Sequence, residues 1–222
     1  MSDKKHSKKE KKQMDKSLKA ILIGAGIVIV LIAAILYLSK NVFTNTNVVE
    51  YNHYTFERYE GDKWVTNQLI RGQVYSIPFY HNPTEVLDIP VDNKSVLAIR
   101  QFSLARPNGT IYISVDPQES SKVVIAGVEY ARILGKGYNM YNMNVKSAIT
   151  QPIDLEAGGP PIITCEDVSP NVFVIQQIIT DKNLVSYDKN CIIIESKDVN
   201  ESIRVADAFS FRLLNIISLS TN

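Results

Sequence analysis

The sequence has little of the chemistry on which metal sites and hydrolytic active sites depend. Its 222 residues include two Cys, three His and one Trp. It contains no HExxH, CxxC, GxSxG or GxxxxGK[ST] motif, so zinc peptidases, thiol redox proteins, serine hydrolases and P-loop nucleotide-binding proteins are not indicated. We therefore expect no catalytic residues, no metal ligands and no cofactor, and a protein that is not an enzyme.

The overall composition is that of an ordinary globular chain, but the charge is unevenly distributed. Hydrophobic residues make up 45% and charged residues 21%, and the net charge is +1, which excludes collagen-like and disordered chains. The first nineteen residues contain eight Lys and three acidic residues. Anionic lipid would be an adequate partner for this basic segment, so it does not require nucleic acid.

Residues 20–38 form an apolar run without a charged residue. At about 1.5 Å per residue, a helix of this length spans about 28 Å, close to the thickness of a bilayer core. Lys is concentrated before the run, which predicts a single-pass membrane protein with a cytoplasmic N-terminus. A buried core helix, a cleaved signal peptide and a pilin-type leader are the alternatives.

The expected organisation follows from this run. Residues 1–19 are a basic cytoplasmic tail, residues 20–38 a transmembrane helix, residues 39–50 a stalk and residues 51–222 an extracytoplasmic domain. The location is then the cell membrane, and the lipid bilayer is a partner. Ala20 and Gly24 have the spacing of small residues at helix–helix contacts, so a second copy of the chain is a candidate partner.

The remaining chain predicts more strands than helices. The expected strands cover residues 51–59, 64–70, 74–80, 95–104, 110–115, 138–149, 162–165, 172–179, 184–187 and 191–195. A helical turn is expected at 83–87, with Asn82 as its cap, and helices are expected from about 116 to 134 and from 199 to 217. The helix that ends at 134 carries apolar residues, among them Val124 and Val128, on more than one face, so it is expected to be largely buried. The Asn108-Gly109 pair predicts a hairpin turn between two of the strands. The predicted fold class is α+β, with the transmembrane helix followed by one mostly antiparallel sheet and two principal helices.

Both Cys fall in the predicted outer domain. An even number of Cys in an oxidising compartment is usually paired, so a disulfide between Cys165 and Cys191 is expected. Two buried thiols are the alternative. The sequence also has three N-glycosylation sequons, which begin at Asn93, Asn108 and Asn200, and Asn108 is the best candidate because it lies in a predicted turn.

Several segments resemble one group of proteins. These are IITCEDVSPNVFVI and NCIIIESKD around the two Cys, the helix ESIRVADAFSFRLLNII, and YSIPFYHNPTEVLDI upstream. Together they resemble uncharacterised membrane-anchored proteins of archaea. The resemblance implies one N-terminal span that carries an extracytoplasmic α+β domain, and it implies no activity.

The functional expectation is a non-enzymatic binding or structural component of the cell envelope or of a membrane complex. Its expected partner is another envelope or membrane protein, and no nucleic-acid partner is expected. A pilin-like structural subunit and an extracellular enzyme are the alternatives.

Overall fold

The computed structural model describes residues 26–35, 47–59, 62–153 and 159–219. The chain divides into two units, residues 1–46 and Asn47–Asn222. In the first unit, the described residues form a helix at 26–35. All other described elements belong to the second unit.

The membrane-spanning helix predicted at residues 20–38 needs correction. Of this run, the structure describes residues 26–35, which are helical. Among the described residues, no helix combines the length and the apolar character that a membrane crossing requires. The single-pass anchor and the cell-membrane location inferred from it are therefore not supported. The predicted tail at 1–19, the rest of the run, and the predicted stalk up to residue 46 lie outside the described residues.

Four strands near the start of the second unit form an antiparallel sheet, called sheet A, in chain order. Its strands are β1 (Val48–Tyr51), β2 (Tyr54–Arg58), β3 (Trp64–Ile70) and β4 (Gln73–Phe79). The turn between β1 and β2 has positive φ at Asn52 and His53, as a two-residue type I′ turn requires. Pro78 lies in β4, at the edge of the sheet, where the missing N–H is tolerated.

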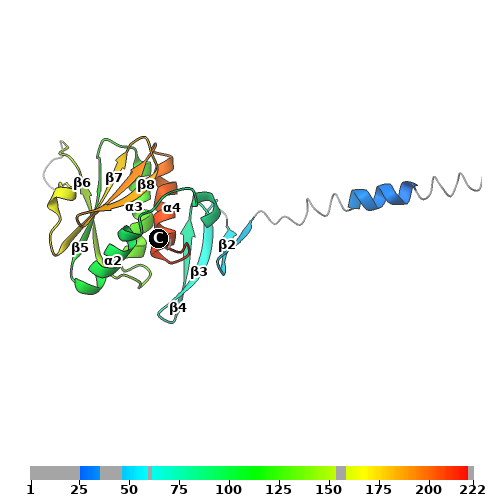
Figure 1. Ribbon diagram of the computed structural model, residues 1–222, viewed down its shortest axis with the longest axis horizontal. Helices are drawn as coiled ribbons and strands as arrows, with labels where there is room; N and C mark the ends of the chain where they lie inside the picture. The colour runs from blue at the N-terminus through cyan, green and yellow to red at the C-terminus, as the bar shows by residue number, and fades with distance from the viewer. Residues whose placement is uncertain (1–25, 36–46, 60–61, 154–158, 220–222) are drawn as a thin grey trace, which may run out of the picture. The chain divides into compact units, whose positions relative to one another are not determined.

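A second sheet, sheet B, has five strands in the order β6-β5-β7-β9-β8. They are β5 (Thr110–Val115), β6 (Asn144–Ile149), β7 (Val172–Ile179), β8 (Leu184–Asp188) and β9 (Cys191–Ser196). Strands β6, β5, β7 and β9 run parallel to one another, and β8 pairs with β9 in antiparallel orientation. Three helices accompany sheet B: α2 (Asn93–Ala105), α3 (Ser121–Leu134) and α4 (Glu201–Leu213) (Figure 1). Two 3₁₀ turns, η1 (Pro83–Val86) and η2 (Cys165–Asp167), lie in connections.

The predicted single antiparallel sheet with two principal helices is therefore wrong, although the α+β content is as expected. One cause is α2, which was predicted as a strand at residues 95–104. The buried residues Val96 and Ile99 are three apart, as on a helix face, and the Asp92 carboxylate accepts a hydrogen bond from the N–H of Lys94 at the helix start. Asn108 and Gly109 have no positive φ, and β5 begins after them without a hairpin.

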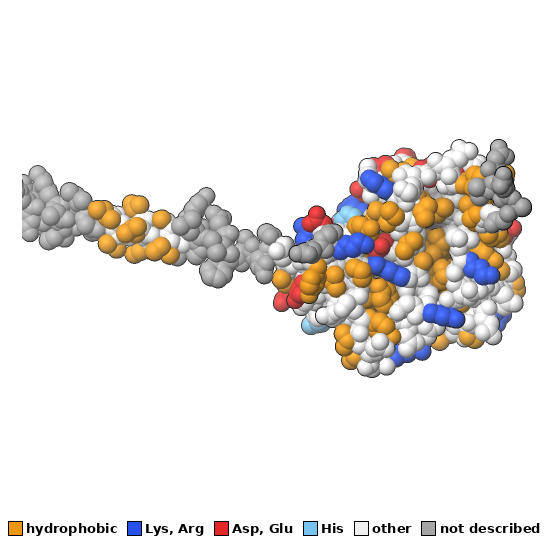
Figure 2. All heavy atoms as spheres, turned by 180° about the vertical axis from the view of Figure 1, so that it is seen from behind, with side chains coloured by type: hydrophobic (Ala, Val, Ile, Leu, Met, Phe, Trp, Pro, Cys, Tyr) orange, Lys and Arg blue, Asp and Glu red, His pale blue; other side chains and the backbone are white. Residues whose placement is uncertain are grey.

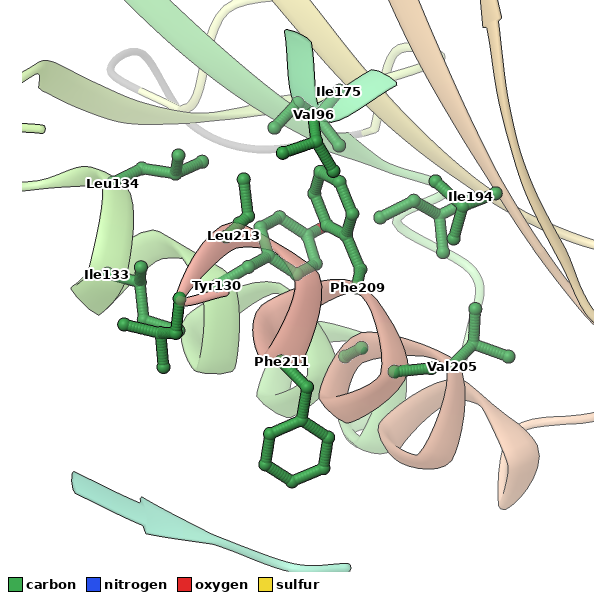
Figure 3. Close-up of a cluster of buried hydrophobic side chains, with 14 of the residues drawn as sticks. Val96, Tyr130, Ile133, Leu134, Ile175, Ile194, Val205, Phe209, Phe211 and Leu213 are labelled. Carbon is green, nitrogen blue, oxygen red and sulfur yellow. The ribbon is translucent and has the colours of Figure 1, made fainter. Parts of the chain in front are cut away.

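Helix α4 packs against both sheets. Figure 3 shows Phe209 directed toward Val96 and Ile175, while Phe211 points away from them. The Phe211 ring lies 4.4 Å from that of Phe79 in β4 and 5.6 Å from that of Phe56 in β2, measured between centroids. Contacts on both sides explain why nine of the thirteen residues of α4 are buried.

Candidate functional site

A groove runs between α3 and the edge strand β6. It has a volume of about 550 Å³, within the range of ligand pockets. Val124, Val128 and Ala131 of α3 form one wall, and strands β5 and β6 form the floor and the other wall. The remaining lining residues are Ile113, Val115, Gly127, Arg132, Gly135, Lys136, Met143, Asn144, Val145, Lys146, Ser147 and Ala148.

The wall formed by α3 is apolar although it faces solvent. Val124 is 51% and Val128 is 55% exposed. Apolar residues on more than one face of this helix predicted that it would be largely buried, but only one of these faces is covered. The second apolar face was the sequence signal for the groove.

The charges at the groove have one sign. Arg132, Lys136 and Lys146 line it, and no acidic residue does so among the described residues. Arg132 is already bound to the Glu129 carboxylate and to the Pro78 carbonyl. The two Lys side chains are exposed and have no ion-pair partner in the described part of the chain. Lys136 is therefore available to an anionic ligand in the groove. Lys146 is available to one at the edge of β6, because alternation along the strand places its side chain on the face of sheet B away from α3.

Gly127 brings α3 close to sheet B at the base of the groove. A Cβ atom at this position would lie 3.0 Å from Nε2 of Gln177 and 3.1 Å from Cγ2 of Ile113. The same Gln177 amide donates a hydrogen bond of 3.0 Å to the carbonyl of Val123 in α3. The glycine therefore sets the close spacing between the helix and the groove floor.

A cluster of buried charges lies where β4 ends against α3 and α4. The fully buried Asp207 accepts hydrogen bonds at Oδ2 from the backbone N–H of His81, at 2.9 Å, and contacts His81 Nδ1 at 3.0 Å. Burial raises the pKa of Asp207, and His81 opposes this rise. Burial also raises the pKa of Glu129, while the Arg132 guanidinium lowers it. Because Asp207 holds the backbone of His81, the pair fixes the end of sheet A to α4.

The outer face of sheet A is the second hollow of comparable size. It is lined by His53, Tyr54, Thr55, Glu57, Tyr59, Val65, Asn67 and Ser76. Two internal hydrogen bonds, from Tyr59 to Glu57 and from Ser76 to Asn67, already engage much of its polar surface. It is the face of an antiparallel sheet that solvent normally covers.

Exposure alone does not identify a binding surface in this protein. Figure 2 shows apolar side chains spread over one face, with Lys and Arg side chains among them. Single exposed apolar side chains are ordinary on protein surfaces. The α3–β6 groove differs because its apolar residues gather around one hollow of about 550 Å³.

The predicted disulfide between Cys165 and Cys191 is confirmed. It joins η2 to the first residue of β9, with a Cα–Cα distance of 5.4 Å. Cys165 also donates its backbone N–H to the side chain of Gln176 in β7, at 3.1 Å. The bridge therefore fastens the segment before β7 to the face of sheet B.

The three sequons lie in different settings. Asn93 is the first residue of α2 and is half-buried, Asn108 is exposed in the connection before β5, and Asn200 is exposed at the start of α4. Ser95 and Ser202, the third residues of two of the sequons, are buried. Asn108 has the most accessible setting, and its glycosylation stays a prediction.

No group of three or more His, Cys, Asp or Glu side chains is arranged to hold a metal ion among the residues that the structure describes.

Comparison with known protein families, with characterised proteins and with solved structures finds no match to this chain. The resemblance to archaeal membrane-anchored proteins therefore stays a prediction.

Proposed function

We propose that this chain is a non-enzymatic binding protein whose ligand occupies the groove between α3 and β6. The supporting observation is the combination of an apolar lining with two exposed Lys side chains that lack an ion-pair partner among the described residues: Lys136 at the groove, and Lys146 on the opposite face of the edge strand β6. Burying the exposed parts of Val124 and Val128 would favour binding at about 25 cal/mol per Å² of apolar surface. The ligand is therefore apolar and carries negative charge.

The position of the His81–Asp207 pair supports a non-enzymatic role. A carboxylate that orients a His is also a part of catalytic sites. Here the carboxylate additionally accepts the backbone N–H of His81, and thereby connects β4 to α4. Contacts to both the backbone N–H and the ring of His81 indicate that Asp207 has a structural role. The pilin-like subunit and the enzyme stay predictions without a comparable feature in their favour.

Binding of 8-anilinonaphthalene-1-sulfonate, an apolar anion, tests this proposal. We expect saturable fluorescence enhancement with the wild-type chain and an affinity at least about tenfold lower for Val128→Glu, since a negative charge would then enter the apolar wall. Leu104→Glu is the matched control, because Leu104 is 84% exposed and lies outside the groove. Equal binding by the wild-type chain and Val128→Glu would contradict the proposal.

A further inference from the structure

We propose that the ligand is an extended segment of a partner protein, which adds to the free edge of β6 as a sixth strand of sheet B. Its apolar side chains enter the α3–β6 groove, and acidic side chains alternate with them. This inference rests on the proposed function, because it uses the same groove. Three observations specify the occupant.

The first observation is the direction of the backbone groups of β6. In a parallel ladder, the N–H and C=O of one residue point to the same side, and alternate residues point to opposite sides. Ile149 donates its N–H to Pro161 and accepts from the N–H of Ile163, both at 3.0 Å, on the side away from β5. By the same alternation, Val145 and Ser147 direct their backbone groups away from β5.

These groups of Val145 and Ser147 are open to a partner. The hydrogen bonds of β6 on this side end at Ile149, which forms an isolated parallel bridge with Ile162. No other described backbone segment pairs with the outer side of β6. The contact at Ile162 shows that the edge accepts an added strand, and the next two sites along it are free.

The second observation is the match between strand periodicity and the groove. The side chains of a strand alternate between the two faces of its sheet. Val145 and Ser147 line the groove on the side of α3. Every second side chain of an added strand would therefore point into the groove beside Val124 and Val128.

The third observation is the charge. Lys146 lies between Val145 and Ser147 in β6 and is exposed, so its side chain belongs to the opposite face of the sheet. The other alternate residues of an added strand would meet this Lys, and an acidic residue there gives a favourable cross-strand pair. A second copy of the chain would instead bring its own Lys136 and Lys146 to this edge. The sign of the charge thus favours an acidic partner over self-association.

A peptide that alternates Glu and Val tests the proposal on the 222-residue chain. We expect it to bind, and we expect affinities at least about tenfold lower for a peptide with Lys in place of Glu and for one of the same composition with the Val residues adjacent. N-methylation distinguishes strand addition from other modes. Methyl groups on one alternate set of amides should abolish binding, and methyl groups on the other set should not, because only one set faces β6. Equal effects of the two sets would overturn the proposal.

Variants of Ser147 test the same edge from the protein side. Ser147→Pro removes the outward N–H and should lower the peptide affinity about tenfold, whereas Ser147→Ala should bind like the wild-type chain. Thermal unfolding of both variants shows whether they are folded. If Ser147→Pro is unfolded, the N-methylated peptides decide alone.

The outcomes separate this inference from the proposed function. Binding of 8-anilinonaphthalene-1-sulfonate without any binding of the alternating peptide would overturn strand addition and leave the groove as a ligand site. If neither 8-anilinonaphthalene-1-sulfonate nor the alternating peptide binds, both proposals are overturned. A dimer of the chain that persists with the peptide present and is lost in Ser147→Pro would assign the edge to a second copy, and would also overturn the inference.

Discussion

The Asp207 side chain connects the segment after β4 to α4, but one of its buried oxygen atoms is left without a hydrogen bond in the described part of the chain. It is fully buried, and its Oδ2 contacts both the backbone N–H and Nδ1 of His81. Its Oδ1 has no hydrogen-bond partner among the described residues. A buried carboxylate with incomplete hydrogen bonding favours the protonated form, and this explains the raised pKa.

The raised pKa of Asp207 predicts a pH dependence of stability. The folded chain retains this proton to a higher pH than the unfolded chain, whose carboxyl has a pKa near 3.8. The free energy of unfolding of the wild-type chain should therefore fall, relative to that of Asp207→Asn, as the pH rises from 3.8 through the raised pKa, and the difference should then be constant. The expected change is about 1.4 kcal/mol for each pH unit that separates the two pKa values.

Denaturant unfolding between pH 3.5 and pH 7 measures this difference. Asp62→Asn is the control variant, because the Asp62 side chain is 91% exposed. A pH-independent difference between the wild-type chain and Asp207→Asn would contradict the assignment of Asp207 as the titrating group.

Gly127 gives a second prediction at the scale of one residue. Gly127→Leu places a side chain against Gln177 and Ile113, so α3 must move away from sheet B. We expect the free energy of unfolding to fall by about 1–3 kcal/mol. Val128→Ala, on the exposed side of the same helix, should change it by less than about 1 kcal/mol. Equal stability of the two variants would show that the close contact at Gly127 is unimportant.

At the scale of elements, the disulfide connects η2 to β9. The two Cys are 26 residues apart, and closing a loop of this length stabilises a fold by about 3–4 kcal/mol in the chain-entropy description. We expect dithiothreitol to lower the unfolding midpoint of the wild-type chain and to leave the Cys165→Ser/Cys191→Ser double variant unchanged. Two free thiols in the unfolded, unreduced chain would refute the bridge.

The sequence predicted elements better than their arrangement. Strand β7 has the predicted bounds, α3 ends at the predicted Leu134, and the cap at Asn82 correctly indicated the turn η1. These features depend on local signals. The order of sheet B depends on parallel pairing between distant segments, for which the sequence carries no local signal.

The sequence predicts the wrong secondary structure for α2 and the wrong extent of burial for α3. The segment at residues 95–104 contains residues common in strands, but Val96 and Ile99 are spaced for a helix face. In α3, the apolar pattern predicts that Val124 and Val128 are buried, but both border the groove. An amphipathic pattern shows which side chains are apolar, but it does not show which apolar face another element covers. The sequence therefore indicated the apolar face that borders the groove, but not that this face would be left uncovered.

At the scale of the whole compact unit, Asn47–Asn222, α4 joins the two sheets. Phe211→Ala would remove the ring that contacts Phe56 and Phe79 and should lower the free energy of unfolding by about 3–5 kcal/mol.

Trp64, the only Trp of the chain, lies in sheet A and reports on this sheet by fluorescence. Its transition should coincide with that of the circular dichroism signal in the wild-type chain. An earlier fluorescence transition would show that sheet A unfolds separately.

Strand addition at the outer edge of β6 would change the exchange of individual backbone amides. Amide hydrogen exchange, followed by NMR on the chain with and without the alternating Glu–Val peptide, reports directly on the N–H groups of Val145 and Ser147. We expect both to exchange readily in the free chain and to become protected when the peptide is bound, while Asn67 on the outer face of sheet A is unaffected. Protection of Asn67 and its neighbours, with no change at Val145 and Ser147, would contradict the assignment of the binding site to β6.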